Sequence, residues 1–233
     1  MRAWAPLAVL VLAEIGYPLV SGGTRAALVV CTVVLGFAVS LSHAWTTRGP
    51  RVAARLVAVT VGGGFAVEAL GVATGFPFGS YHYTDALGPR LLGVPLVIPL
   101  AWTWMAWPAC LAAQGRVLVA GLGLAAWDLF LDPQMVAEGY WQWHNPSPAL
   151  PGVPDVPLTN YLGWLVVAVA MMALLPRTEG HDAPMHALYL WTYASSILAH
   201  AVFLGLPASA AWGALGMGLV ALPLAVRLAW SSR

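Results

Sequence analysis

The sequence has 233 residues, of which 60% are hydrophobic and only 8% are charged. That charged fraction is about a third of the share usual in soluble domains, and the mean hydropathy is +0.79. A soluble domain of this size cannot bury so much apolar side chain in one core, which excludes soluble, disordered and disulfide-scaffold proteins. The formal net charge of +1 implies no nucleic-acid partner. The composition favours a helical integral membrane protein.

Eight apolar segments are long enough, or nearly so, to cross a hydrocarbon core, which takes about 20 helical residues. The fifth segment is short and ends at Asp132-Pro133, and only Leu206-Pro207 separates the last two. We therefore predict an all-α, polytopic helical bundle with about eight transmembrane helices, with seven as the alternative. The predicted segments are 4–20, 26–45, 53–74, 94–113, 117–132, 160–176, 184–205 and 208–229.

Arginine placement favours eight spans. With a cytoplasmic N-terminus, most arginines fall on the inner side, which is the asymmetry that the positive-inside rule expects. The inner arginines are Arg2, Arg48, Arg51, Arg55, Arg116, Arg177, Arg227 and Arg233, and the outer ones are Arg25 and Arg90. We predict that both termini are cytoplasmic and that residues 1–233 form a single integral membrane domain. Such a chain is a multi-pass protein of the cell membrane, the plasma membrane in a bacterium.

The connections 75–93 and 133–159 are longer than the other links, which are only a few residues long. Both fall on the predicted outer side, and both are rich in aromatic residues, proline and glycine. Aromatic side chains at such density are typical of a membrane interface or of the lining of an apolar ligand site.

Ionisable side chains inside predicted helices are costly in a membrane, and each one needs a reason. In the predicted topology they gather in the outer halves of their helices, beside the two aromatic connections. The acids are Glu14, Glu68, Asp128 and Asp132, and His200 and Asn160 lie at the same depth. This clustering at one depth predicts a functional site on the outer side.

Asp128 and Asp132 are four residues apart, so a helix places both on one face. Two carboxyl groups so close together in a low dielectric do not both ionise easily, and such a pair can supply a general acid and a general base. The alternative is that Asp132 ends its helix before Pro133 and pairs with Arg90.

The other polar residues each have a structural alternative. Glu68 and Glu14 can simply hydrogen-bond to a neighbouring helix. His82, between Tyr81 and Tyr83, can be a proton carrier or a brace for its loop. Metal-ligand atoms also exist here, but the spacing of metal-binding motifs is absent, so we expect no metal. The residues that could supply such atoms are His82, His144, Asp128, Asp132 and Glu138.

Buried carboxylic acids beside many Trp and Tyr residues suit acid-catalysed addition to an isolated alkene of a lipid. Protonation of a trisubstituted double bond gives a tertiary carbocation, which aromatic faces stabilise through their quadrupoles. A second group then orients a water molecule for attack. Capture of the cation by water makes the enzyme a hydratase, and capture by an internal alkene makes it a cyclase.

Three stretches resemble the signatures of the integral-membrane carotenoid hydratase family often called CruF. The first covers residues 75–90 (GFPFGSYHYTDALGPR) and 93–102 (GVPLVIPLAW). The second covers residues 126–141 (AWDLFLDPQMVAEGYW), and the third covers residues 157–164 (PLTNYLGW). The resemblance extends over about residues 62–175, and the flanks match only in hydropathy.

The resemblance implies a lyase that adds water to the terminal C1=C2 double bond of an acyclic (ψ) carotenoid end and gives a tertiary 1-hydroxy group. Its substrates would be γ-carotene-like or lycopene-like pigments, with no organic cofactor. The implied partners are the lipid substrate, water, the membrane and other carotenoid biosynthesis enzymes. A membrane cyclase or isomerase, and a non-catalytic carotenoid-binding or transport protein, are the alternatives.

From the chemistry we assign the proton donor to Asp128, with Asp132 or Glu68 tuning it. His82 or Asp85 would orient the water molecule. The residues expected to line the polyene end and face the cation are Tyr81, Tyr83, Phe76, Phe78, Trp127, Tyr140, Trp141, Trp143 and Asn160.

Overall fold

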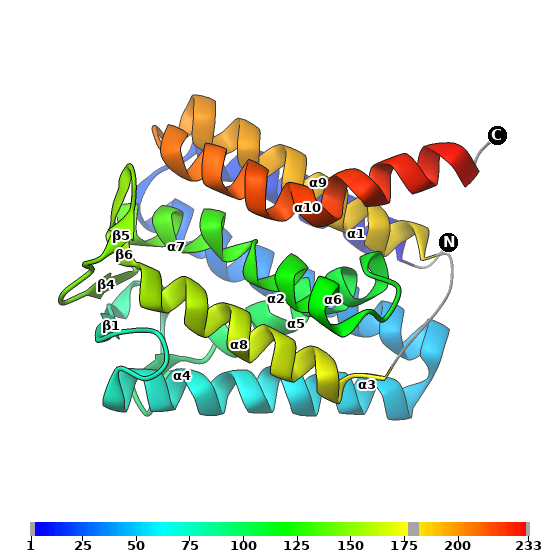
Figure 1. Ribbon diagram of the computed structural model, residues 1–233, viewed down its shortest axis with the longest axis horizontal. Helices are drawn as coiled ribbons and strands as arrows, with labels where there is room; N and C mark the ends of the chain where they lie inside the picture. Colours follow the sequence, from blue (N-terminus) through cyan, green and yellow to red (C-terminus); the bar gives the residue numbers. More distant parts are fainter. Residues whose placement is uncertain (1–2, 177–181, 232–233) are drawn as a thin grey trace.

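The computed structural model describes residues 3–176 and 182–231 of the chain. These residues form an all-α bundle with short strands at one end (Figure 1). The helices are α1 (Trp4–Gly16), α2 (Gly22–Arg48), α3 (Pro50–Val57), α4 (Gly63–Thr74), α5 (Ile98–Ala112), α6 (Val117–Ala125), α7 (Asp128–Ala137), α8 (Leu158–Leu174), α9 (Ala183–Leu198) and α10 (Pro207–Ser231). Short 3₁₀ and π turns extend or join several of them, namely η1 (Tyr17–Leu19), η2 (Ala58–Gly62), η3 (Asp85–Leu87) and η4 (Ala199–Phe203).

The helices follow the apolar segments of the sequence. Four helical stretches are long and apolar enough to cross a membrane, and they are Gly22–Arg48, Pro50–Thr74, Val117–Ala137 and Pro207–Ser231. Trp4–Leu19 and Leu158–Leu174 are shorter apolar helices. The number of spans and the orientation of the termini stay predictions, and Arg2, Arg177 and Arg233, on which the orientation partly depends, lie outside the described residues.

The strands lie together at one end of the bundle, called the strand end below, and the N- and C-termini lie at the opposite end (Figure 1). β1 (Tyr81–Tyr83) pairs antiparallel with β4 (Trp141–Trp143), so the two long aromatic connections meet. β2 (Arg90–Leu91) pairs with β3 (Val94–Pro95), and β5 (Ala149–Leu150) pairs with β6 (Val153–Pro157). Both connections therefore fall at the same end of the bundle, as the alternation of helices predicts.

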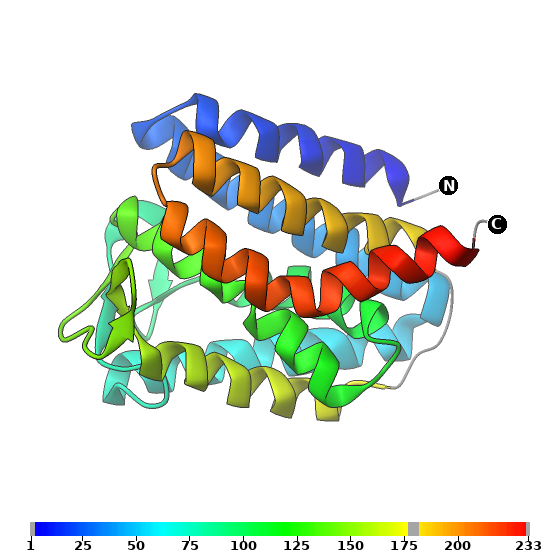
Figure 2. The same ribbon diagram turned by 45° about the horizontal axis from the view of Figure 1, so that its top comes forward.

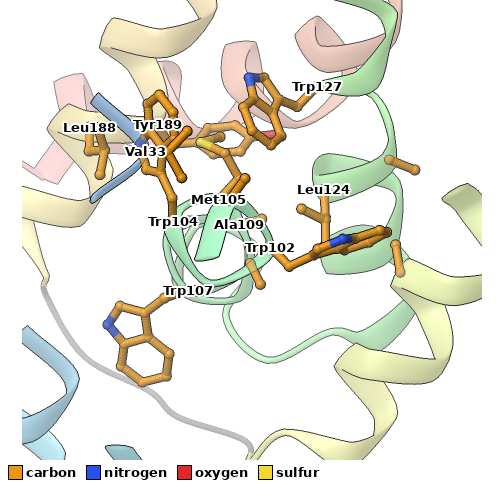
Figure 3. Packing of buried hydrophobic residues seen from close by; sticks show 14 of the residues in the cluster. Val33, Trp102, Trp104, Met105, Trp107, Ala109, Leu124, Trp127, Leu188 and Tyr189 are labelled. Atoms are coloured by element: carbon orange, nitrogen blue, oxygen red, sulfur yellow. The ribbon is translucent and has the colours of Figure 1, made fainter. Parts of the chain in front are cut away.

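Helix α5 is the centre of the bundle. It is apolar around its whole circumference and almost all of its residues are buried, as expected of a core helix. Figure 3 looks along α5 and shows Trp102, Trp104 and Trp107 projecting from different sides of the helix. Trp104 contacts Trp127 edge to face, with ring centroids 5.5 Å apart.

Three of the described helices contain an internal proline, namely Pro108 in α5, Pro133 in α7 and Pro223 in α10, and in α5 and α7 a serine bonds to the carbonyl that the proline leaves free. Proline lacks an N–H, so it leaves the carbonyl four residues earlier without its helical donor. Pro108 frees the carbonyl of Trp104, which accepts a hydrogen bond from the Ser40 hydroxyl at 2.9 Å. In the same way, Pro133 frees the carbonyl of Leu129, which accepts from Ser209 at 2.7 Å.

The continuation of α7 past Pro133 corrects the predicted end of the fifth segment. Helix α7 does not stop at Asp132 but continues to Ala137. Asp132 therefore does not terminate the helix, and it does not pair with Arg90, whose guanidinium instead binds Asp85 and the Tyr83 carbonyl.

Candidate active site

A cavity of about 590 Å³ lies at the strand end of the bundle. This volume is within the range of small-molecule sites. Its lining is mainly apolar and aromatic, with a few polar groups from α1, α4, α7, α8 and α9. The aromatic residues in the lining are Tyr17, Phe78, Tyr81, Tyr83, Trp102, Trp104, Trp127, Phe130, Trp141, Trp143, Trp164, Trp191 and Phe203.

Strands β1 and β4 cover one side of the cavity. Side chains alternate along a strand, so Tyr81 and Tyr83 turn inward and are buried, whereas His82 between them is exposed. Across the pair, Tyr81 lies 5.5 Å from Trp143 and Tyr83 lies 5.4 Å from Trp141, measured between ring centroids. The strand pair thus presents four aromatic rings to the cavity.

Glu68, on α4, is 4% exposed and accepts hydrogen bonds from three neutral donors. Its Oε2 accepts from the hydroxyls of Tyr81 at 2.6 Å and Tyr83 at 2.8 Å, and its Oε1 accepts from Trp102 Nε1 at 3.2 Å. Burial, followed by the neighbouring Glu68 charge, raises the pKa of both tyrosines above the usual value of a phenol. Both hydroxyls therefore keep their protons and donate to Glu68.

Asp128 and Asp132 form a second carboxyl group cluster on α7. Asn160, at the start of α8, donates through Nδ2 to Asp128 Oδ2 at 2.7 Å and also to Asp132 Oδ2. Trp141 Nε1 donates to Asp132 Oδ1 at 3.1 Å. Both aspartates are buried, but only Asp132 is among the residues that line the cavity. One amide thus joins two carboxyl groups, of which Asp132 faces the space where a ligand would bind.

Several other predicted residues also reach this space. Phe78, Tyr81, Tyr83, Trp127, Trp141, Trp143 and Asn160 line the cavity together with Glu68 and Asp132. Asp128 lies directly behind them, joined through Asn160. The clustering of the acids and the aromatic connections at one depth therefore corresponds to one site in the structure.

Four predicted residues lie elsewhere. His82 is exposed and stacks on His144, with ring centroids 5.1 Å apart. Asp85 pairs with Arg90, and its side chain is 89% exposed. Phe76 is 69% exposed, and Tyr140 is buried but does not line the cavity. The structure does not bring these side chains to the carboxyl groups.

Several residues that line the cavity were not expected from the sequence. Trp102 and Trp164 stack face to face with ring centroids 4.0 Å apart and an interplanar angle of 13°. Tyr17 and Gln134 also line the cavity. Trp102 and Trp164 fall within the family-like stretches quoted above, and this was a usable signal, whereas nothing in the local sequence around Tyr17 marks it.

Glu14 and His200 form hydrogen bonds with uncharged side chains from other helices. Glu14 lines the cavity, and its Oε2 accepts from Trp191 Nε1 at 2.7 Å, which is the helix-to-helix hydrogen bond considered above. His200 contacts Ser209 and Gln134. In residues 3–176 and 182–231, no group of three or more His, Cys, Asp or Glu side chains is arranged to hold a metal ion.

Parts of the chain are similar to known proteins. Residues 28–228 match the sequence pattern of a family described as carotenoid biosynthesis protein. A bisanhydrobacterioruberin hydratase from Haloarcula japonica is 34% identical over 123 residues, which cover 48% of this chain and 40% of that protein. This chain thus matches less than two thirds of the length of that relative. No solved structure is significantly similar.

Proposed function

Because the chain belongs to the carotenoid biosynthesis protein family, we propose that the cavity hydrates the end of a carotenoid. The reaction adds water to the terminal C1=C2 double bond of an acyclic (ψ) end and gives a 1-hydroxy carotenoid. The hydratase activity of the Haloarcula relative supports this choice of reaction. The observation that supports it most is the presence of three buried carboxyl groups, with only neutral partners among the described residues, beside an aromatic cavity.

The first step is protonation of the alkene. We assign the donor to Asp132 rather than to Asp128, since Asp132 lines the cavity. The π electrons of the double bond form a C–H bond with the Asp132 proton, the O–H bond breaks, and a tertiary carbocation remains. Asp128 supports this role through Asn160, because two carboxyl groups joined by one amide hold one proton more readily than two negative charges.

The aromatic rings and Glu68 stabilise the cation. The faces of Trp102, Trp164 and Trp127 carry negative electrostatic potential and attract a cation without forming a bond to it. Three hydrogen bonds fix the oxygens of Glu68. The Glu68 carboxyl group can therefore stabilise the cation electrostatically without bonding to it as an ester. A water oxygen then bonds to the cation and loses a proton to the carboxylate that Asp132 has become, which restores the acid.

An apolar mouth fits a lipid substrate. The cavity lining includes four exposed large apolar side chains, Ile15, Leu19, Leu198 and Phe203, which are 47%, 69%, 56% and 52% exposed. They come from the adjacent helices α1 and α9 and the turns that extend them (Figure 2). A polyene end can therefore enter from the hydrocarbon while the rest of the chain stays in lipid.

The test is expression in a host that makes lycopene, followed by chromatography and mass analysis of the pigments. The proposal predicts pigments that have gained the mass of one or two waters. A ringed product of unchanged mass would instead indicate a cyclase, and pigment that copurifies unchanged would indicate a binding protein.

A further inference from the structure

Hydration requires a water molecule inside a cavity that is mainly apolar and opens toward lipid. We propose that Tyr17 and Gln134 form a water-binding site in the cavity wall, next to the apolar mouth and supplied from the strand end past the Arg25–Glu138 ion pair. This inference rests on the proposed hydratase function, because only that reaction consumes water.

Tyr17 lines the cavity and also contacts a partly exposed ion pair. The residue is only 7% exposed and lines the cavity, and its hydroxyl, which lies beside Gln134, forms no hydrogen bond of normal geometry with the described residues. The guanidinium carbon of Arg25 lies 5.4 Å from the centre of the Tyr17 ring. Arg25 pairs with Glu138, and the side chains of this pair are 17% and 21% exposed. A buried polar group without a partner is costly, and a bound water molecule would satisfy it.

Gln134 lies beside Tyr17 and also lines the cavity. On the side away from the cavity its amide contacts His200, with His200 Nε2 3.0 Å from Gln134 Oε1. The orientation of this amide follows from the hydrogen bonds of His200. Ser209 donates its single proton to the Leu129 carbonyl at 2.7 Å, so it must accept from His200 Nδ1–H at 2.9 Å.

The other ring nitrogen of a neutral His200 is then an acceptor. Both partners of this buried histidine are uncharged, so an imidazolium would have no counterion there. The structure places Gln134 Oε1 against His200 Nε2. Because Nε2 is an acceptor, we assign the amide the other way round, so that its N–H donates to His200 Nε2 and its carbonyl oxygen is left for the cavity side. The Gln134 carbonyl and the Tyr17 hydroxyl provide an acceptor and a donor, which are the two partners that a bound water needs.

Loss of this site would change the fate of the cation rather than prevent its formation. Without water, the cation loses a proton from an adjacent carbon to the Asp132 carboxylate, the C–H electrons form a new double bond, and the acid is restored. The product is an isomeric alkene whose mass equals that of the substrate. In D₂O, Asp132 carries a deuteron, so this unhydrated product retains deuterium on carbon.

The experiment uses membranes that contain the full chain, incubated with lycopene in D₂O. We compare wild type with Tyr17→Phe and Gln134→Leu, and Gln142→Leu is the matched control because Gln142 is exposed on β4. Removing one hydrogen bond to the water should lower the ratio of hydrated to unhydrated deuterated pigment by about 3- to 10-fold. The control should keep the wild-type ratio.

Two results would overturn the inference. One is a wild-type ratio in both variants, and the other is a parallel loss of hydration and of deuterium uptake, which would mean that the cation no longer forms. Failure of the proposed function itself has a different signature, because the wild-type protein would then make no hydrated pigment.

Discussion

The two ends of the bundle both bury polar side chains, but they do so in opposite ways. At the end away from the strands, Asp182 pairs with the Arg48 guanidinium at 2.5 Å, and His43 Nε2 lies 3.5 Å from the same carboxylate. His43 is fixed in turn by Trp107, whose Nε1 donates to His43 Nδ1 at 3.0 Å. This arrangement compensates charge and joins α2, α5 and the start of α9.

Beside the cavity at the strand end, the hydrogen-bond donors to the buried carboxyl groups of Glu68, Asp128 and Asp132 are neutral in the part of the chain that the structure describes. Glu68 binds two tyrosines and a tryptophan, and Asp132 binds a tryptophan and an asparagine. A carboxyl group that is paired with a cation stays ionised and holds the fold together. A carboxyl group among neutral donors can exchange a proton, so the comparison separates a structural cluster from a candidate catalytic one.

The largest expected effect is at Asp132. Asp132→Asn keeps the size of the side chain and removes the acid, and hydration should fall about 100-fold or more because general acid catalysis is worth that much. Asp155→Asn is the control, since Asp155 is exposed on β6. Pigment analysis by mass measures both variants, and wild-type hydration in Asp132→Asn would refute the assignment of the acid.

The second effect is on stability at the opposite end. Asp182→Asn leaves Arg48 and His43 without their carboxylate and should cost about 2 kcal/mol, which is less than a fully buried pair because Arg48 is 19% exposed. Thermal unfolding in detergent should show a lower Tm, while hydration per folded molecule changes less than twofold. If Asp182→Asn lost hydration at an unchanged Tm, the Asp182 cluster would not be purely structural, and the contrast between the two ends would be wrong.

A smaller effect on the product ratio should distinguish Ser40 from Ser209, the two serines that donate to the carbonyl groups left free by Pro108 and Pro133. Ser40→Ala and Ser209→Ala each leave one carbonyl without its donor and should cost a similar amount, about 1 kcal/mol. Only Ser209 also contacts His200 and, through it, Gln134. Only Ser209→Ala should therefore lower the share of hydrated product. Equal product ratios in the two variants would contradict a role of Ser209 in positioning Gln134.

The smallest effect is expected at the residues that the sequence suggested for water orientation. His82→Gln and Asp85→Asn should each change hydration less than twofold, because both side chains lie away from the cavity. A loss of tenfold or more in either variant would restore the original hypothesis.

The helices and the gathering of the buried acids at one end of the bundle could be predicted from the sequence, because hydropathy and the cost of a buried acid are local properties. The shared helix face of Asp128 and Asp132 follows from their spacing and is confirmed by their common donor, Asn160. The alternation of Tyr81, His82 and Tyr83 would have separated His82 from its neighbours, had the segment been read as a strand.

Other features depend on contacts between distant segments. The pairing of β1 with β4 joins residues about 60 positions apart, and it determines which aromatic rings face Glu68. The continuation of α7 past Pro133 depends on Ser209, which lies on another helix. No local pattern identifies either contact.

The central claim is that a buried carboxyl group protonates the alkene, and one measurement tests it most directly. Membranes containing the protein are incubated with lycopene in D₂O, the product is returned to ordinary water, and carbon-bound deuterium is counted by mass analysis. We expect one carbon-bound deuterium for each hydrated end, and no deuterium uptake above background in Asp132→Asn. A hydroxylated product that contains no carbon-bound deuterium would contradict it.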